Sequence, residues 1–278
     1  MPELPEVETI CRGLKENIIN KEISDVKISD KKLRFNYPEN FIQNLNNSKI
    51  INISRRARYI LIYLENNQIL LIHLGMTGKL NFFQEFNDKI TKHDHIIIKF
   101  SNNSFLIYND IRRFGFVDLF QLKEKESHKM LKNLAIEPLS EKFNTKYLQE
   151  RLKNKSINIK NIMMDNKIVV GVGNIYINES LFLSNISPER AANKVTLSEL
   201  EKLVKNIKEI LQKAINKGGS TLRDYKKLNG DIGNFQFNFT VYGREDKKCE
   251  ICQTKIKRIK QNCRSTFFAL IVRKNKNL

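Results

Sequence analysis

Residues 50–74, IINISRRARYILIYLENNQILLIHL, decide the fold class of the first part of the chain. They contain three runs rich in β-branched and aromatic residues: Ile50–Ile53, Tyr59–Leu64 and Gln68–Leu74. Asn66 and Asn67 separate the last two runs, and asparagine tolerates the positive φ that a tight hairpin turn requires. The stretch therefore predicts consecutive antiparallel strands.

The sequence on either side extends this pattern. Two more runs, Ile96–Phe100 and Phe105–Tyr108, flank Asn102-Asn103. Several hairpins within about 100 residues are typical of an antiparallel sandwich or barrel. Before them, apolar residues at helical spacing up to Ile18 predict a helix close to the chain start, with Pro5 in its first turn.

Later in the chain the spacing of apolar residues becomes helical. Thr196-Leu-Ser-Glu199 is a capping-box sequence that opens a long amphipathic helix, and Gly218-Gly219 ends it. From Phe235 to Val241 apolar and polar residues alternate, which predicts a strand, and Cys249–Phe268 predicts a small hairpin. The sequence thus divides into a β domain, a helical domain and a small C-terminal β module.

The charge of the chain favours a polyanionic partner. Its 278 residues carry 49 Lys and Arg against 30 Asp and Glu, a net charge of +19. Nucleic acid is the leading candidate, although the high lysine content could also reflect a general compositional bias. No apolar run approaches the ~18 residues of a membrane span, and the first residues do not resemble a signal peptide, so we expect a soluble cytoplasmic protein.

The start of the chain can carry chemistry. After removal of Met1, Pro2 would present a secondary amine, which forms a cationic iminium with an aldehyde-level carbon. Glu3 and Glu6 are carboxyl groups near enough in sequence to move or position a proton. Proline and glutamate are also common in a first helical turn, so this segment alone favours a purely structural role.

The cysteines do not form a disulfide framework, because there are only four: Cys11, Cys249, Cys252 and Cys263. Cys249 and Cys252 have the spacing of half a zinc site, but a structural site needs four ligands and only Cys263 follows. Because a ligand is missing, the sequence favours the alternative that they are ordinary turn cysteines.

An ordered series of motifs runs along nearly the whole chain: Met1-Pro-Glu-Leu-Pro-Glu-Val-Glu-Thr9, Arg55-Arg-Ala-Arg-Tyr59, His73-Leu-Gly-Met-Thr-Gly78, Lys92-His-Asp-His95, Asp110-Ile-Arg-Arg-Phe-Gly115, Met164-Asp-Asn-Lys167, Gly171-Val-Gly-Asn-Ile-Tyr176, Val241-Tyr-Gly-Arg244 and Arg264-Ser-Thr-Phe267. Together they resemble the bacterial formamidopyrimidine-DNA glycosylase family, repair enzymes for oxidised purines. The resemblance implies an α+β fold with an N-terminal catalytic β-sandwich (1–122), a helix-two-turn-helix DNA-binding domain (123–229) and a C-terminal β-hairpin finger (230–278).

The resemblance also implies an activity and its residues. The expected protein is a base-excision-repair glycosylase that removes 8-oxoguanine and formamidopyrimidines from duplex DNA through a Pro2 Schiff base, with an AP lyase activity by β,δ-elimination. The implied catalytic residues are Pro2, Glu3, Glu6, Arg58 and Arg264. The implied DNA contacts are His73, His93, Arg112, Lys155, Asn174 and Tyr242.

Excision requires the damaged nucleotide to leave the base stack. The residues that match the family's void-filling set are Met76, Arg112 and Phe114. Without the motif context, core packing is the better interpretation of Met76 and Phe114. The segment Ser220–Asn234 corresponds to the family loop that closes over the everted base.

The chain departs from the family pattern at two places. Arg58 stands where the family usually has the lysine credited with proton donation, and arginine is a poor proton donor near pH 7. Ala269 and Val272 replace a Cys-x-x-Cys pair of the finger. The sequence therefore predicts a finger without zinc, in which Cys249 and Cys252 are remnants, Cys263 is a doubtful third ligand, and the apolar residues Phe267, Phe268 and Leu270 stabilise the hairpin.

Two other functions remain open on sequence alone. An endonuclease VIII-like glycosylase for oxidised pyrimidines shares the Pro2-Glu3 start, and a non-catalytic DNA-binding protein could keep the same fold. The intact Pro2, Glu3 and Glu6 favour the enzyme. We expect damaged double-stranded DNA as the partner, no membrane, no cofactor for the chemistry and a monomer.

Overall fold

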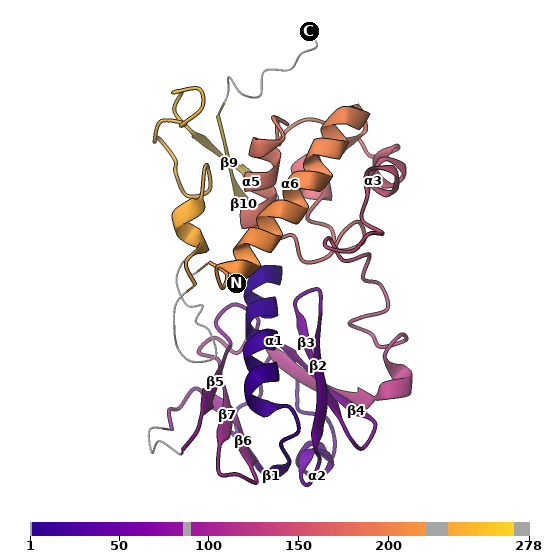
Figure 1. The fold of residues 1–278 in the computed structure, drawn as a ribbon, viewed down its shortest axis with the longest axis vertical. Coiled ribbons are helices and arrows are strands. Elements are labelled where there is room, and N and C mark those ends of the chain that lie inside the picture. Colours follow the sequence, from indigo (N-terminus) through magenta and orange to yellow (C-terminus); the bar gives the residue numbers. More distant parts are fainter. Residues whose placement is uncertain (1, 86–89, 221–232, 270–278) are drawn as a thin grey trace. The chain divides into compact units, whose positions relative to one another are not determined.

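The computed structural model describes residues 2–85, 90–220 and 233–269 (Figure 1). The chain divides into two compact units. The first comprises Met1–Lys132 with Lys217–Asn234, and the second comprises Asn133–Asn216 with Phe235–Leu278.

The described strands of the first unit form two four-stranded antiparallel sheets. One sheet has the order β1 (Ile23–Ile28), β6 (Asp94–Phe100), β7 (Phe105–Asn109) and β5 (Lys79–Phe83). The other has the order β2 (Ile50–Arg56), β3 (Tyr59–Leu64), β4 (Gln68–His73) and β8 (Phe116–Gln121). Both sheets contribute to one apolar core, so the expected β-sandwich is confirmed. Asn67 and Asn103 have φ of 61° and 62°, as expected for these hairpin turns.

Helix α1 (Leu4–Ile18) packs its apolar side into the same core, together with the short α2 (Phe41–Leu45), whereas η1 (Leu122–Glu124) follows β8. Strand β2 runs antiparallel to α1: the Cys11 thiol lies 3.7 Å from the Ser54 carbonyl oxygen, and Arg55 Nε lies 2.9 Å from Glu8 Oε2. The turn between β2 and β3 therefore lies toward the N-terminal end of α1.

The second unit is mainly helical. Its helices are α3 (Thr145–Leu152), α4 (Ile159–Ile162), α5 (Asn174–Leu183), η2 (Ala192–Lys194), α6 (Leu197–Asn216) and η3 (Phe235–Asn238), and its hairpin consists of β9 (Lys257–Gln261) and β10 (Arg264–Phe268). The predicted capping box of α6 is present, because the Thr196 N–H donates to Glu199 Oε2 at 2.9 Å. Gly218 and Gly219 follow the helix with φ of 74° and 77°.

The strand predicted from Phe235 to Val241 is wrong, because the segment begins with the 3-10 helix η3. Three residues per turn place positions i and i+2 on different faces, so Phe235 is buried while Phe237 is 79% exposed. The N–H groups of Thr240, Val241 and Tyr242 donate to the Glu179 carboxylate instead of to a neighbouring strand. None of the described helices is long and apolar enough to cross a membrane.

Candidate active site

The first turn of α1 is fixed by the buried Glu6 carboxylate. Glu6 Oε2 accepts the Glu3 N–H at 2.8 Å, and Oε1 accepts the Ser220 N–H at 2.8 Å and the Ser220 hydroxyl at 3.0 Å. Pro2 and Glu3 are buried as well. Glu6 thus links the backbone next to Pro2 to Ser220, a residue 214 positions away in the chain.

Close packing of Gly219 makes this link possible. Gly219 has φ of 77°, and a Cβ at this position would lie 3.0 Å from Glu6 Cγ and 3.1 Å from Glu6 Oε1. A larger residue would push Ser220 away from the carboxylate. The loop predicted over Ser220–Asn234 lies mostly outside the described residues, which resume at Gly233.

Arg58 lies in the two-residue turn between β2 and β3, next to Ala57, whose φ is 52°. Arg55 fixes this turn, since its Nε pairs with Glu8 Oε2 at 2.9 Å and its Nη1 donates to the Ala57 carbonyl oxygen at 3.0 Å. The Arg58 guanidinium is thereby carried on the turn that points toward the start of α1. It supplies positive charge there, but it is a poor proton donor.

His73, the last residue of β4, is a neutral side chain that shapes the following turn. Its Nδ1 accepts the Gly75 N–H at 3.2 Å, and its ring stacks on Phe116 with a centroid distance of 5.2 Å. Burial, followed by the positive charges of Arg58 and Arg34, lowers the pKa of His73 to about 4. At neutral pH it can offer a phosphate an N–H donor but no positive charge.

The three predicted void-filling residues lie on two exposed loops of the first unit. Met76 is 40% exposed and Phe114 is 45% exposed, so core packing does not explain either side chain. The Arg112 guanidinium lies over the Phe114 ring, 4.5 Å from its centroid. His93 is joined to the same region, because its carbonyl oxygen accepts the Asp110 N–H at 3.0 Å.

In the second unit, α5 holds one face of the hairpin. Asn174 Nδ2 donates to the Ser265 carbonyl oxygen at 3.0 Å, and Asn178 Oδ1 accepts the Phe267 N–H at 2.8 Å. The structure therefore brings Asn174 next to Arg264, the exposed first residue of β10. Lys155, another predicted DNA contact of this unit, is exposed and lies shortly after the end of α3.

Tyr242 is held by a residue that sequence reasoning missed. Its N–H donates to Glu179 Oε1 at 2.8 Å, and its ring makes an edge contact with Phe267 at a centroid distance of 5.0 Å. Glu179 is 3% exposed and is the only charged residue in the otherwise apolar and polar α5. A single acidic residue in such a helix could have indicated this role from the sequence, because a buried carboxylate requires hydrogen-bond donors around it.

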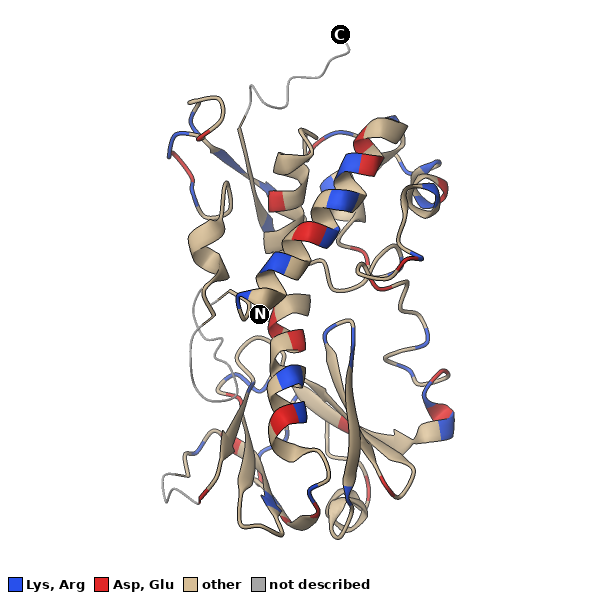
Figure 2. Cartoon of the chain, viewed as in Figure 1, with Lys and Arg blue, Asp and Glu red and all other residues tan. Residues whose placement is uncertain are grey.

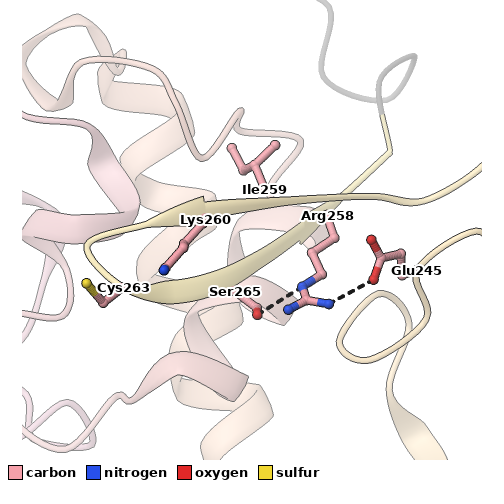
Figure 3. Close-up of a pocket in the computed structure, with 6 residues that line it drawn as sticks. All are labelled: Glu245, Arg258, Ile259, Lys260, Cys263 and Ser265. Carbon is pink, nitrogen blue, oxygen red and sulfur yellow. Dashed lines mark hydrogen bonds and ion pairs between the residues drawn. The ribbon is translucent and has the colours of Figure 1, made fainter.

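The described residues of the hairpin do not fit a zinc site. Cys249 is buried in an apolar cluster with Ile256, Phe267 and Ala269, among other residues. Cys263 is exposed at the turn between β9 and β10 (Figure 3). No group of three or more His, Cys, Asp or Glu side chains that could hold a metal occurs in the described part of the chain.

The groove in Figure 3 has a different chemistry from a metal site. Arg258 spans it, with Nε 3.1 Å from Ser265 Oγ and Nη1 3.1 Å from Glu245 Oε2.

Basic residues are spread over the elements of both units in the view of Figure 2, so charge alone does not outline the site.

Comparison with known proteins gives a consistent result over the whole chain. The family profile "Formamidopyrimidine-DNA glycosylase N-terminal domain" matches residues 1–117, and "Formamidopyrimidine-DNA glycosylase H2TH domain" matches residues 134–226. A formamidopyrimidine-DNA glycosylase of Wolbachia pipientis subsp. Culex pipiens is 48% identical over 96% of this chain and 98% of its own length. One of Bartonella henselae is 42% identical with the same coverage.

Solved structures agree with the sequence relatives. A Lactococcus lactis FPG mutant in complex with a Fapy-dG-containing DNA is similar with a TM-score of 0.91 and 34% identity, covering 98% of this chain and all of the other. The Lactococcus lactis Fpg complex with an abasic-site DNA has a TM-score of 0.89 at the same identity and coverage.

Proposed function

We propose, because the chain belongs to the formamidopyrimidine-DNA glycosylase family, that it excises oxidised purines from duplex DNA and then cleaves the strand at the resulting abasic site. The observation that carries the proposal is the start of α1. There, Pro2 and Glu3 are buried side by side, and the Glu6 carboxylate fixes the Glu3 backbone.

The reaction begins with the secondary amine of Pro2. Its nitrogen attacks C1′ of the damaged nucleotide, the bond from C1′ to the base breaks, and Glu3 transfers the protons that open the sugar and release the base. The product is an iminium between Pro2 and C1′. Because the iminium withdraws electrons, the C2′ proton becomes acidic, and its removal expels the 3′ phosphate by β-elimination. A second elimination expels the 5′ phosphate.

The remaining candidates act on the DNA backbone and on the vacated stack. Arg58 and Arg264 supply positive charge to phosphates, and Arg264 assists the second elimination. His73, His93, Lys155, Asn174 and Tyr242 position the duplex. Met76 and Phe114 fill the space left by the everted nucleotide, and Arg112 hydrogen-bonds the orphaned base.

The test is borohydride trapping of a covalent complex with a duplex containing 8-oxoguanine. The mature protein should be trapped, whereas a form that retains an extra residue ahead of Pro2 should not be trapped and should not cut. Glu3→Gln should form little complex with 8-oxoguanine DNA. Undiminished cutting by the extended form would refute the Pro2 nucleophile.

Lesion choice separates this function from its nearest rival. A Lactococcus lactis Fpg has been solved with an oxidized pyrimidine containing DNA, so pyrimidine lesions need a direct comparison. We expect excision of 8-oxoguanine and formamidopyrimidines to exceed that of thymine glycol in single-turnover assays. The opposite order would favour the endonuclease VIII-like alternative, and the absence of both activities would favour a non-catalytic DNA-binding protein.

The finger of this enzyme is proposed to lack zinc, and the buried cluster around Cys249 supports this. Elemental analysis of purified protein should find much less than one zinc per chain, and stoichiometric zinc would contradict the proposal. We also propose a cytoplasmic monomer with three domains, 1–122, 123–229 and 230–278, all of which contribute DNA contacts.

A further inference from the structure

The Asp110 carboxylate joins the two loops that carry the void-filling residues. It is fully buried. Asp110 Oδ1 accepts the Thr77 hydroxyl at 2.5 Å and the Arg112 N–H at 3.2 Å. Asp110 Oδ2 accepts the Gly115 N–H at 2.8 Å and the Tyr108 hydroxyl at 3.4 Å. One buried charge therefore fixes both the Met76 loop, through Thr77, and the loop from Asp110 to Gly115.

Thr77 completes the connection from the opposite side. Its hydroxyl oxygen accepts the Arg112 N–H at 3.1 Å while its proton is donated to Asp110. Thr77, Asp110 and the Arg112 backbone thus form a closed triangle of hydrogen bonds. Such a network is stable in a buried position only when its polar groups are satisfied, so the geometry of both loops is tightly specified.

The two loops also touch directly through their backbones. Gly75, one residue before Met76, has φ of 59°, and a Cβ there would lie 2.5 Å from the carbonyl carbon of Phe114. No side chain fits between the loops at this point. The Arg112 guanidinium lies over the Phe114 ring, so these two side chains contact each other directly.

The His95 side chain is buried next to Asp110 and is 1% exposed. Its Nε2 lies 2.9 Å from the Asp110 carbonyl oxygen and its Nδ1 lies 2.9 Å from Ser29 Oγ. The position of Asp110 is therefore set by its backbone as well as by its carboxylate.

We propose that Asp110 and Thr77 are positioning residues that hold Met76, Arg112 and Phe114 as one preformed wedge. The inference rests on the proposed function of the three exposed residues. A wedge that is ordered before binding loses little conformational freedom when the duplex opens, so it lowers the cost of nucleotide eversion and keeps Arg112 in register with the orphaned base. Asp110 and Thr77 act through Met76, Arg112 and Phe114 and do not take part in the chemical step.

The central experiment compares Thr77→Val with Thr77→Ser. Valine keeps the shape and removes the hydroxyl, whereas serine keeps the hydroxyl. Single-turnover excision of 8-oxoguanine opposite cytosine should fall by about 10-fold or more in Thr77→Val and by less than about 3-fold in Thr77→Ser. The ratio of excision opposite cytosine to excision opposite adenine should change in Thr77→Val only. Asp118→Asn, a carboxylate on β8 that pairs with Lys129, is the matched control and should change neither quantity.

A second substrate separates a positioning role from general damage to the fold. A single-stranded oligonucleotide with a preformed abasic site has no orphaned base, so its cleavage by Thr77→Val should stay within about 3-fold of the unsubstituted protein. An equal loss on both substrates would overturn the inference. Failure of the unsubstituted protein to cut the abasic strand would instead refute the proposed function.

A third measurement does not require a buried substitution. Arg112→Ala and Phe114→Ala remove exposed side chains, so both variants should fold. If the wedge acts as a unit, the double variant should lose little more excision activity than the single variant with the larger loss. Fully additive losses would mean that the two side chains act independently and would overturn the inference even if Thr77→Val does not fold.

Discussion

Substitution of Glu6 by glutamine tests how the start of α1 is positioned. The glutamine oxygen can keep the two hydrogen bonds from Ser220, but its NH₂ group then faces the Glu3 N–H, which loses its acceptor. A hydrogen bond to a charged acceptor contributes about 1.5–3 kcal/mol, and a buried donor left without a partner adds to the loss. We expect a destabilisation of about 2–3 kcal/mol at this site. That corresponds to a change of roughly 30- to 150-fold in the equilibrium constant between molecules with Pro2 in place and molecules with it displaced.

The assay is single-turnover borohydride trapping on 8-oxoguanine DNA, together with urea unfolding followed by far-UV circular dichroism. Trapping by Glu6→Gln should slow by up to about the same factor, because covalent attack requires the amine in place. Glu16→Gln is the matched control, since Glu16 is an exposed residue of the same helix and its substitution should change stability by less than about 0.5 kcal/mol. Trapping by Glu6→Gln at the unsubstituted rate, with unchanged stability, would refute the positioning role.

Three further predictions concern single residues. Arg58→Lys should speed strand cleavage relative to base release by about 10-fold, because lysine can donate a proton near neutral pH; an unchanged ratio in single-turnover assays would count against this. Gly219→Ala should lower the stability and the trapping rate more than Gly243→Ala does. Both glycines have a positive φ, but only Gly219 lies against Glu6. Equal losses of stability in thermal melts would contradict the contact argument. The folded-state pKa of His73 lies below its unfolded value, so its contribution to stability is full above about pH 6.5 and is lost as pH falls toward 4. Between pH 7 and pH 5 the chain should lose about 2 kcal/mol more than His73→Gln does, and parallel pH profiles would be the contrary result.

The sequence predicted what depends on local patterning and could not predict what depends on distant hydrogen bonds. Runs of β-branched and aromatic residues, together with asparagine turns, located β2, β3, β4, β6 and β7 but not β1, β5 or β8, and the capping box located α6. The alternation after Phe235 misled, because its outcome depended on the distant Glu179 carboxylate. Local patterns describe one segment at a time, so they do not report which acceptor a backbone N–H finds elsewhere.

The same distinction applies to the candidate site. Motifs identified Pro2, Met76 and Phe114, and the structure places the last two in exposed loops as a wedge would require. The residues that hold such groups in position, Ser220 and Asp110, carry no signal of that role in a single sequence. Their importance comes from contacts that form only after folding.

The buried Cys249 cluster has a consequence for the conditions under which this protein can work. Oxidised purines arise where oxidants are abundant, and oxidants attack the thiolates that hold zinc fingers together. If the hairpin lacks zinc, as proposed above, it has no such metal-bound thiolates and needs no zinc from the cell. The repair protein would then still bind DNA under the oxidising conditions that produce its substrate.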